Sequence, residues 1–140
     1  MGYFNQYVRA ESLEEAYGLY QKKNNFVLGG MLWLKMRKRP FGTAIDLSDL
    51  GLDQIEEDEK EFRIGAYVSL RELETNEALN TYTKGAFAES VKHIVGVQFR
   101  NVATVGGSLW GRYGFSDVMT IFRAMGAKVQ LHHAGILDLD

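Results

Sequence analysis

Two glycine pairs are the residues whose type and spacing best suit binding chemistry. Gly29-Gly30 lies in FVLGGMLWL, residues 26–34, and a second pair lies in NVATVGGSLWGRYGFSD, residues 101–117. A glycine lets the backbone approach a phosphate closely, and unpaired N–H groups in the first turn of a helix point at an anion. Each pair follows residues of strand type, and the first pair runs into residues of helix type. Two such turns suggest a long polyanionic ligand held at two places, although a tight turn without a ligand explains either pair alone.

Other residues with reactive side chains are expected to be structural. His93 lies near a predicted helix end, and His132 and His133 are adjacent in the tail, on opposite faces if the tail is a strand. No other group of ligand chemistry is near them in sequence, so we expect surface or partly buried histidines and no metal site. Asp46 and Asp49 follow a strand and are expected to cap a turn. No catalytic residue is predicted, because the chain shows no Ser/His/Asp order and no paired-carboxylate motif.

Composition excludes several classes of function. The 140 residues suit one domain of modest size or two small lobes, and 46% of them are apolar. A net charge of −2 gives no global attraction to nucleic acid. The absence of cysteine excludes disulfides and thiolate clusters and fits a reducing compartment. No apolar run approaches the length of a membrane span and the N-terminus lacks the pattern of a secretory signal, so we expect a cytoplasmic protein.

Periodicity predicts an α/β (α+β) fold in two lobes. The first lobe, residues 1–49, reads β-α-β-α-β. Its helix is expected to begin at Ser12 with Glu15 completing a capping box. The expected segments are strands over 3–9, 26–28 and 43–47, a helix from Ser12 that ends in the polar segment 21–25, and a helix over 31–36. The basic run 35–39 is expected to be solvated surface rather than a partner-binding patch.

The second lobe, residues 50–140, is predicted to begin with a hairpin around the acidic turn 58–60. Ser69 and Glu72 form a second capping-box pattern. Further helices are expected around Phe87 and from Ser116 to Met125, with a strand over 127–131. The alternating residues 136–139 look like the beginning of another strand with nothing to cover it. We therefore expect a piece of a longer protein, incomplete at its C-terminus, with a naturally fraying end as the alternative.

Three blocks of the sequence resemble one known family. They are FVLGGMLWLKMR, IDLSDLGLDQIEEDEKEFRIGAYVSLREL and HIVGVQFRNVATVGGSLWGRYGFSDVMTIFRAMGAKVQL. In this order they are similar to the first flavin loop, the strand–hairpin–helix unit and the second flavin loop of the flavoprotein subunit or domain of molybdenum hydroxylases. Those are enzymes of the xanthine dehydrogenase, carbon monoxide dehydrogenase and aldehyde oxidase type. The blocks cover most of the chain, and the third is the strongest match.

The resemblance implies FAD extended between two α/β lobes. Backbone N–H groups of 26–33 would hold the pyrophosphate, residues 104–108 would hold the other side of the FAD, and Asp117 would accept a hydrogen bond from a flavin-side or ribitol hydroxyl. Ile94 falls near the isoalloxazine position. The residues assigned to the cofactor in this way are Phe26, Val27, Leu28, Gly29, Gly30, Met31, Leu32, Trp33, Thr104, Val105, Gly106, Gly107, Ser108 and Asp117.

The sequence also departs from the family pattern. Met31 and Leu32 stand where threonine and an acidic residue are common, and Ser108 replaces the usual asparagine. Backbone contacts survive the changes at Met31 and Leu32, but a threonine hydroxyl and a carboxylate are lost there, whereas Ser108 keeps a shorter polar side chain. The loop with Trp110 and Tyr113 is usually small and contains proline, so these aromatic residues either shape the flavin pocket or pack on the surface.

By this resemblance the chain is an oxidoreductase component that relays electrons. A molybdopterin-binding large subunit and a 2Fe-2S small subunit would be its partners, and FAD would pass the electrons to NAD or another acceptor. The chain alone would be inactive, and an exposed interface could make it self-associate. One alternative is a cofactor-free structural or docking module of the same fold. A different nucleotide-binding domain is weakly supported, because no GxGxxG follows a strand.

Overall fold

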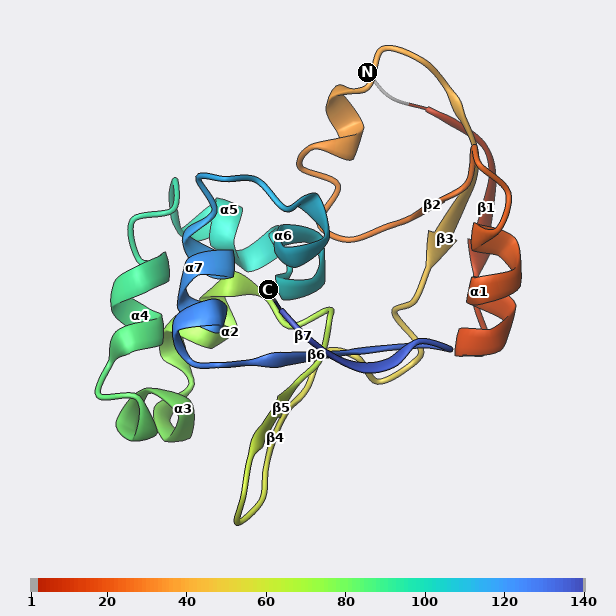
Figure 1. The fold of residues 1–140 in the computed structure, drawn as a ribbon. Helices are drawn as coiled ribbons and strands as arrows, with labels where there is room; N and C mark the ends of the chain where they lie inside the picture. The colour runs from red at the N-terminus through yellow and green to blue at the C-terminus, as the bar shows by residue number, and fades with distance from the viewer. Residues whose placement is uncertain (1–2, 140) are drawn as a thin grey trace.

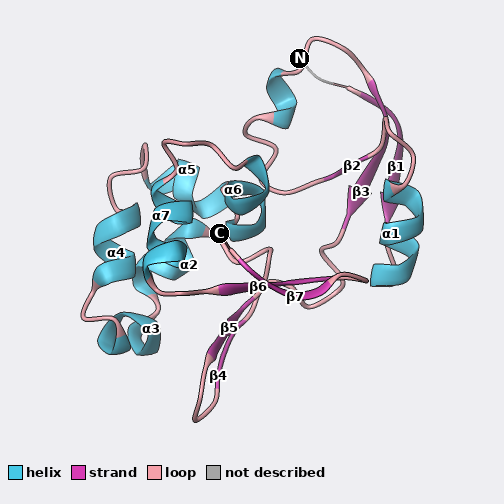
Figure 2. Cartoon of the chain, in the orientation of Figure 1, coloured by secondary structure: helices cyan, strands magenta, loops and turns pink. Residues whose placement is uncertain are grey.

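A three-stranded parallel sheet forms the N-terminal part of the molecule. The structure, a computed structural model, describes residues 3–139, and its elements are shown in Figures 1 and 2. Strands β1 (Phe4–Arg9), β3 (Phe41–Asp46) and β2 (Phe26–Val27) lie in the order β1-β3-β2. Ile45 of the central strand pairs with both Val8 and Val27 and is fully buried. Helix α1 (Leu13–Tyr20) covers the sheet and buries Ala16 against Ile45.

The start of α1 was predicted correctly, whereas the helix over 31–36 was not. The Ser12 side chain accepts a hydrogen bond from the Glu15 amide over 3.0 Å, as a capping residue should. After Gly30 the chain forms a loop and then only a short 3-10 turn, η1 (Leu34–Met36). Met31 adopts a φ of 62°, and Leu32 packs against the core of the C-terminal part. Tertiary packing of Leu32 thus overrides the local helix preference of this segment.

Six short helices form the C-terminal part. They are α2 (Leu70–Thr75), α3 (Glu77–Tyr82), α4 (Ala86–Val91), α5 (Val97–Val102), α6 (Val105–Gly111) and α7 (Asp117–Ala124). Their shared core includes the fully buried Val68, Leu73 and Val91. The predicted boundary between residues 49 and 50 stays a prediction, and a separate apolar cluster lies on each side of it.

Two hairpins complete the fold. Strands β4 (Ile55–Glu57) and β5 (Phe62–Ile64) form the expected hairpin, whose turn is held by the Asp58 carboxylate. Strands β6 (Lys128–Leu131) and β7 (Gly135–Asp138) form a second hairpin. Figure 1 shows the β6–β7 hairpin extending from the helices to α1. The expected tail strand is therefore present, and β6 pairs with it.

The approach to the second glycine pair was predicted wrongly. Residues 97–102 form helix α5 rather than an extended lead-in, and Gly106 and Gly107 lie inside α6 instead of after a strand. Arg100 is buried on α5 and bonds to Glu74 over 2.9 Å and to the Ile94 carbonyl over 3.1 Å. This internal ion pair stabilises α5 against α2. Arg100 is thus a structural residue.

The capping predictions for the later helices are confirmed. Ser69 and Glu72 form a complete capping box at α2, and the Ser116 side chain accepts the amide N–H of Met119 at the start of α7. Asp46 accepts a hydrogen bond from the Ser48 amide over 2.9 Å, so it caps a turn as expected.

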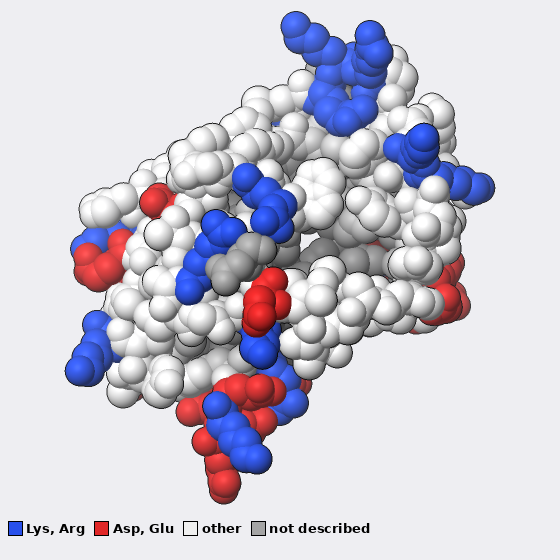
Figure 3. All heavy atoms as spheres, viewed as in Figure 1, with Lys and Arg blue, Asp and Glu red and all other residues white. Residues whose placement is uncertain are grey.

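Charged side chains are spread over the face drawn in Figure 3, with two clear gatherings. Figure 3 shows basic side chains at the top of the view, and acidic side chains gather near the tip of the β4–β5 hairpin. Lys35, Lys38 and Arg39 of the basic run are exposed, as expected for solvated surface. Among residues 3–139, no helix combines the length and the apolar character needed to cross a membrane.

Candidate functional site

The two glycine pairs, more than 70 residues apart in sequence, both lie against the α5–α6 connection. A Cβ atom added to Gly30 would lie 2.2 Å from the Val102 carbonyl oxygen, and one added to Gly29 would lie 2.9 Å from Thr104 Oγ1. The loop after β2 therefore packs directly against the α5–α6 connection. These distances show why glycine is needed here, since any side chain at Gly30 would overlap the backbone of Val102.

The loop after β2 presents a row of backbone hydrogen-bond donors. Among residues 3–139, the structure gives no acceptor for the amide N–H groups of residues 29–33. The Leu28 amide, in contrast, donates to the Ile45 carbonyl over 2.8 Å and is used by the sheet. The positive φ of Met31 turns the chain within this row, and successive N–H groups around such a turn make a concave anion-binding surface. An anion bound by these amides would need neither the Met31 nor the Leu32 side chain.

Tyr67, a residue that the sequence did not single out, fixes the beginning of the donor loop, residues 29–33. Its hydroxyl donates to the Leu28 carbonyl and accepts the Leu47 amide N–H over 3.0 Å. Burial raises the pKa of Tyr67, so the hydroxyl keeps its proton and can donate and accept at once. A single side chain thus links the ends of β2 and β3 to the C-terminal part. A tyrosine shortly before a capping box carries no sequence signal for this role.

Helix α6 offers fewer donors than the sequence suggested. The Val105 amide donates to the Val68 carbonyl over 2.9 Å, the Gly106 amide to the Ala66 carbonyl over 2.8 Å and the Gly107 amide to Thr104 Oγ1 over 3.1 Å. The first turn of α6 is therefore satisfied within the protein. A Cβ on Gly106 would lie 2.8 Å from the Ala66 oxygen, so this glycine serves close packing.

Side chains remain available at the α6 end of the site. The Thr104 hydroxyl accepts the Gly107 amide and keeps its own proton for a ligand. Ser108, the residue after Gly107 in α6, is half-buried. Val105, in contrast, is buried in the core and its contribution is packing. The predicted contacts by Thr104 and Ser108 hydroxyls remain predictions.

Aromatic side chains connect the two loops. The Trp33 ring centroid lies 5.2 Å from that of Tyr113, and Tyr113 stacks on Phe115 with centroids also 5.2 Å apart. All three are exposed. Trp110 is 69% exposed and projects from α6. Two roles were left open for these aromatic residues, shaping the flavin pocket or packing on the surface. Tyr113 fits the first role, because its ring lies beside Trp33 of the loop after β2.

The region around α7 provides an acid and a small cleft. Asp117, the first residue of α7, is exposed, and its hydrogen bond to the cofactor stays a prediction. A cleft of about 120 Å³ lies between Arg112, Ser116 and Arg123. Ligand sites usually measure roughly 300 Å³ or more, so this cleft can hold only part of a dinucleotide.

Phe26 and Val27, which were assigned to the cofactor, and Ile94, expected near it, contribute backbone or packing rather than a polar side chain. The Phe26 ring packs edge-on against Phe41, with centroids 5.4 Å apart, and the Arg37 guanidinium lies 4.5 Å above it. Val27 pairs with Ile45 in the sheet. Ile94, expected near the isoalloxazine, packs against the core of the C-terminal part.

The histidines of the tail have a partner that the sequence did not reveal. His132 and His133 lie in the turn between β6 and β7, and both reach Glu14 of α1. They do not point to opposite faces, because the turn directs both imidazoles toward α1. His93 is exposed and lies elsewhere.

Comparison with known proteins places this fold among flavin-binding domains. Residues 3–136 match the family of the FAD binding domain in molybdopterin dehydrogenase. The chain belongs to this family, and FAD is its cofactor. The resemblance stated from the sequence is therefore confirmed, as is the mixed α/β fold class.

Individual relatives are similar to this chain in sequence or in fold. The chain is 28% identical over 142 residues to the uncharacterized protein YgfM of Escherichia coli strain K12, covering 96% of this chain and 52% of YgfM. The Cu,Mo-CO dehydrogenase structure superposes with a TM-score of 0.88 at 23% identity, over 99% of this chain and 52% of that chain. Quinoline 2-oxidoreductase from Pseudomonas putida 86 gives 0.81 at 20% identity, over 96% and 49%. The chain spans about half the length of these relatives.

Proposed function

We propose that this chain is the FAD-binding electron-transfer part of a molybdenum hydroxylase of the xanthine dehydrogenase type. In this role it receives electrons from iron–sulfur clusters on a 2Fe-2S small subunit, after substrate oxidation on a molybdopterin-binding large subunit. FAD supplies the redox chemistry and passes the electrons to NAD or another acceptor. The chain's share is to bind and orient the cofactor, which requires no catalytic side chain. A cytoplasmic location, as expected from the sequence, belongs to this proposal.

The amide row of residues 29–33, which has no acceptor within the described part of the chain, carries the proposal. A pyrophosphate needs several convergent donors, and this loop offers five successive N–H groups next to the α5–α6 connection. Thr104 adds a hydroxyl from the other side, 2.9 Å from the Cβ position of Gly29. Trp33 and Tyr113 provide an apolar aromatic surface beside the same loop. The residues present therefore fit a flavin dinucleotide at its pyrophosphate.

A direct test is cofactor retention by the purified chain. FAD is added, excess cofactor is removed by desalting, and the visible flavin absorbance and the melting temperature are measured. We expect a retained flavin band and a higher melting temperature, because a ligand of the native state stabilises it. Gly29→Ala should weaken retention, since its Cβ would lie 2.9 Å from Thr104 Oγ1. Gly18→Ala is the matched control, because nothing lies within 4 Å of the added Cβ.

The alternative is a cofactor-free docking module of the same fold. One observation favours it: Leu32, which stands at the family's acidic position, packs against the core and offers no polar group. A colourless protein with no thermal shift on adding FAD would support this alternative and contradict the first proposal. Self-association is a separate expectation, and sedimentation at several concentrations tests it.

A further inference from the structure

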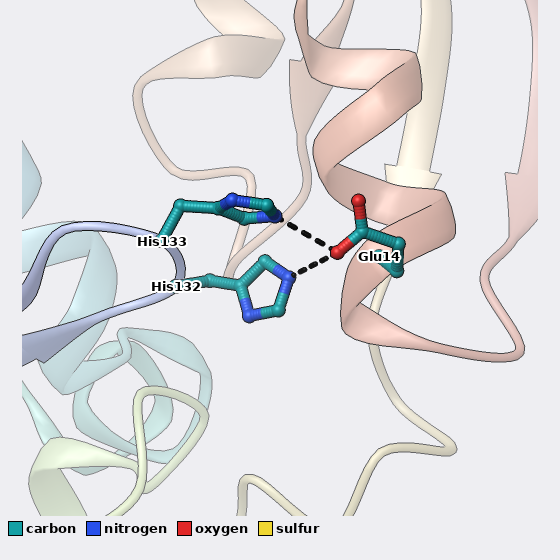
Figure 4. Close-up of side chains that lie close together, drawn as sticks. All are labelled: Glu14, His132 and His133. Carbon is teal, nitrogen blue, oxygen red and sulfur yellow. Dashed lines mark hydrogen bonds and ion pairs between the residues drawn. The ribbon is translucent and has the colours of Figure 1, made fainter.

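Glu14, His132 and His133 form a cluster that includes none of the residues assigned to FAD. Figure 4 shows both imidazoles, from the β6–β7 turn, pointing at the Glu14 carboxylate on α1. The Nε2 atoms of His132 and His133 lie 2.9 Å and 2.8 Å from the same oxygen, Oε2 of Glu14. The residues are 118 and 119 positions apart in sequence, so only the fold brings them together.

The spacing of the donor atoms fits a small divalent cation. The three ligand atoms all lie within 4.8 Å of one another. In a tetrahedral zinc site with bonds of 2.0–2.2 Å, neighbouring donor atoms are about 3.3 Å apart. Each nitrogen–oxygen separation therefore needs to widen by only a few tenths of an ångström. Exposed side chains can make this adjustment by small rotations, without movement of the backbone.

The surrounding residues hold the imidazoles in place. The His133 ring stacks on Tyr17 with centroids 4.2 Å apart and an interplanar angle of 19°. The His132 ring stands nearly perpendicular to His133, at 87° with centroids 4.5 Å apart. Tyr17 follows Glu14 by three residues on α1, so both lie on the helix face toward the turn. The turn itself is closed by the pairing of Leu131 with Gly135.

The ligand chemistry selects the class of metal. Two imidazoles and one carboxylate suit zinc and similar transition metals, whereas magnesium and calcium favour oxygen donors only. The side chains of Glu14, His132 and His133 are 69%, 36% and 47% exposed. Solvent can therefore reach the cluster and supply a fourth ligand. The ion would replace the direct contacts that now join the two imidazoles to the carboxylate.

We propose that Glu14, His132 and His133 bind a divalent transition-metal ion of the zinc class. Such an ion joins α1 of the N-terminal part to the β6–β7 hairpin of the C-terminal part. The site is a structural clip with three protein ligands and water, and it takes no part in flavin binding. Figure 1 shows that the hairpin reaches α1 at this turn, so the clip would fix the two parts of the chain together.

The test uses metal-free protein near neutral pH with Zn²⁺ or Co²⁺ alone. We expect one ion per chain by calorimetry, a visible Co²⁺ spectrum typical of four-coordinate sites, and a melting temperature raised by Zn²⁺. His133→Ala and Glu14→Gln should each weaken binding by about tenfold or more, because even indirect ligand contacts have effects of this size. His93→Ala and Glu11→Gln are matched controls at exposed positions and should bind as the parent does.

Two results would overturn the proposal. One is binding no tighter than about 1 mM, the range of weak surface association. The other is equal affinity in the parent, His133→Ala and Glu14→Gln, which would place the ion elsewhere. The melting temperature of each variant without metal shows whether it is folded, and a variant that does not fold is replaced by His132→Gln. Flavin retention is measured in parallel, so failure of the metal site and failure of the flavin site are distinguishable.

Discussion

Replacing Gly30 with alanine tests whether the donor loop and the α5–α6 connection must touch. The added Cβ would lie 2.2 Å from the Val102 carbonyl oxygen, 2.7 Å from its carbonyl carbon and 3.1 Å from its Cγ1. The first two of these atoms are backbone, so no side-chain rotation relieves the overlap. The loop and the helix must separate by about 1 Å to reach an ordinary contact distance.

The cost follows from this displacement. Overpacking of this kind costs about 1–3 kcal/mol, whereas the lower entropy of the unfolded alanine chain returns about 0.4–1 kcal/mol. We expect a net destabilisation of about 1.5 kcal/mol, which lowers Tm by roughly 4–9 °C in a domain of this size. FAD retention should fall further than stability, because the shift moves the amide donors of residues 29–33 away from the facing Thr104 hydroxyl.

Thermal unfolding and FAD titration of the two variants measure both effects. Gly18→Ala, with nothing within 4 Å of its added Cβ, lies inside α1 and should raise stability by about 0.5–1 kcal/mol. The reasoning is refuted if Gly30→Ala unfolds at the parent temperature and retains FAD as well as Gly18→Ala does. A loss of stability with unchanged FAD affinity would keep the packing explanation and remove the donor loop from the binding site.

Three further variants test other parts of the molecule. Tyr67→Phe removes the hydroxyl between two backbone groups and should cost about 1–3 kcal/mol by denaturant unfolding; an unchanged midpoint would show that solvent replaces it. Burial alone would raise the pKa of Glu74, but the hydrogen bonds and charges of Arg100 and Arg71 outweigh it and hold that pKa below its ordinary value. The stability that ionised Glu74 contributes is therefore fully present above the ordinary glutamate pKa. It is lost as pH falls through the lower pKa that Glu74 has in the folded protein. Glu74→Gln should destabilise the chain by about 3 kcal/mol at neutral pH. The difference in stability between the parent and this variant should shrink on acidification. A difference that does not change with pH would contradict the ion-pair explanation. Asp117→Asn should weaken FAD binding about tenfold with little change in stability, whereas Asp53→Asn should change neither, and equal FAD affinities would exclude the Asp117 contact.

Local signals in the sequence predicted the helices and the turn whose ends are held by hydrogen bonds between residues close in sequence. Ser12, Ser69 and Ser116 begin helices because each side chain accepts an amide of the first turn, an interaction within four residues. The acidic turn of the β4–β5 hairpin was predictable for the same reason. The position of the flavin loops came from resemblance to a family, since glycine pairs alone do not identify a ligand.

Long-range contacts decided the features that were missed. Residues 31–36 favour helix locally, but Leu32 gains more by packing against the distant core. Helix α5 replaces an expected extended segment because its Arg100 pairs with Glu74, 26 residues away. The partner of His132 lies 118 residues earlier in the chain, so no sequence spacing could indicate the Glu14 cluster.

The two glycine pairs differ in what they contribute, although their sequences look alike. Gly29 and Gly30 allow the backbone to approach Val102 and Thr104, and the adjoining amides remain available for an anion. In α6, Gly106 allows contact with Ala66, and the amides of that turn are already bonded within the protein. In the proposed binding mode, a dinucleotide would therefore meet main-chain donors on one side and hydroxyl groups on the other. Because backbone donors do not depend on side-chain identity, the changes at Met31 and Leu32 are compatible with pyrophosphate binding, and specificity for the rest of the cofactor falls to the side chains.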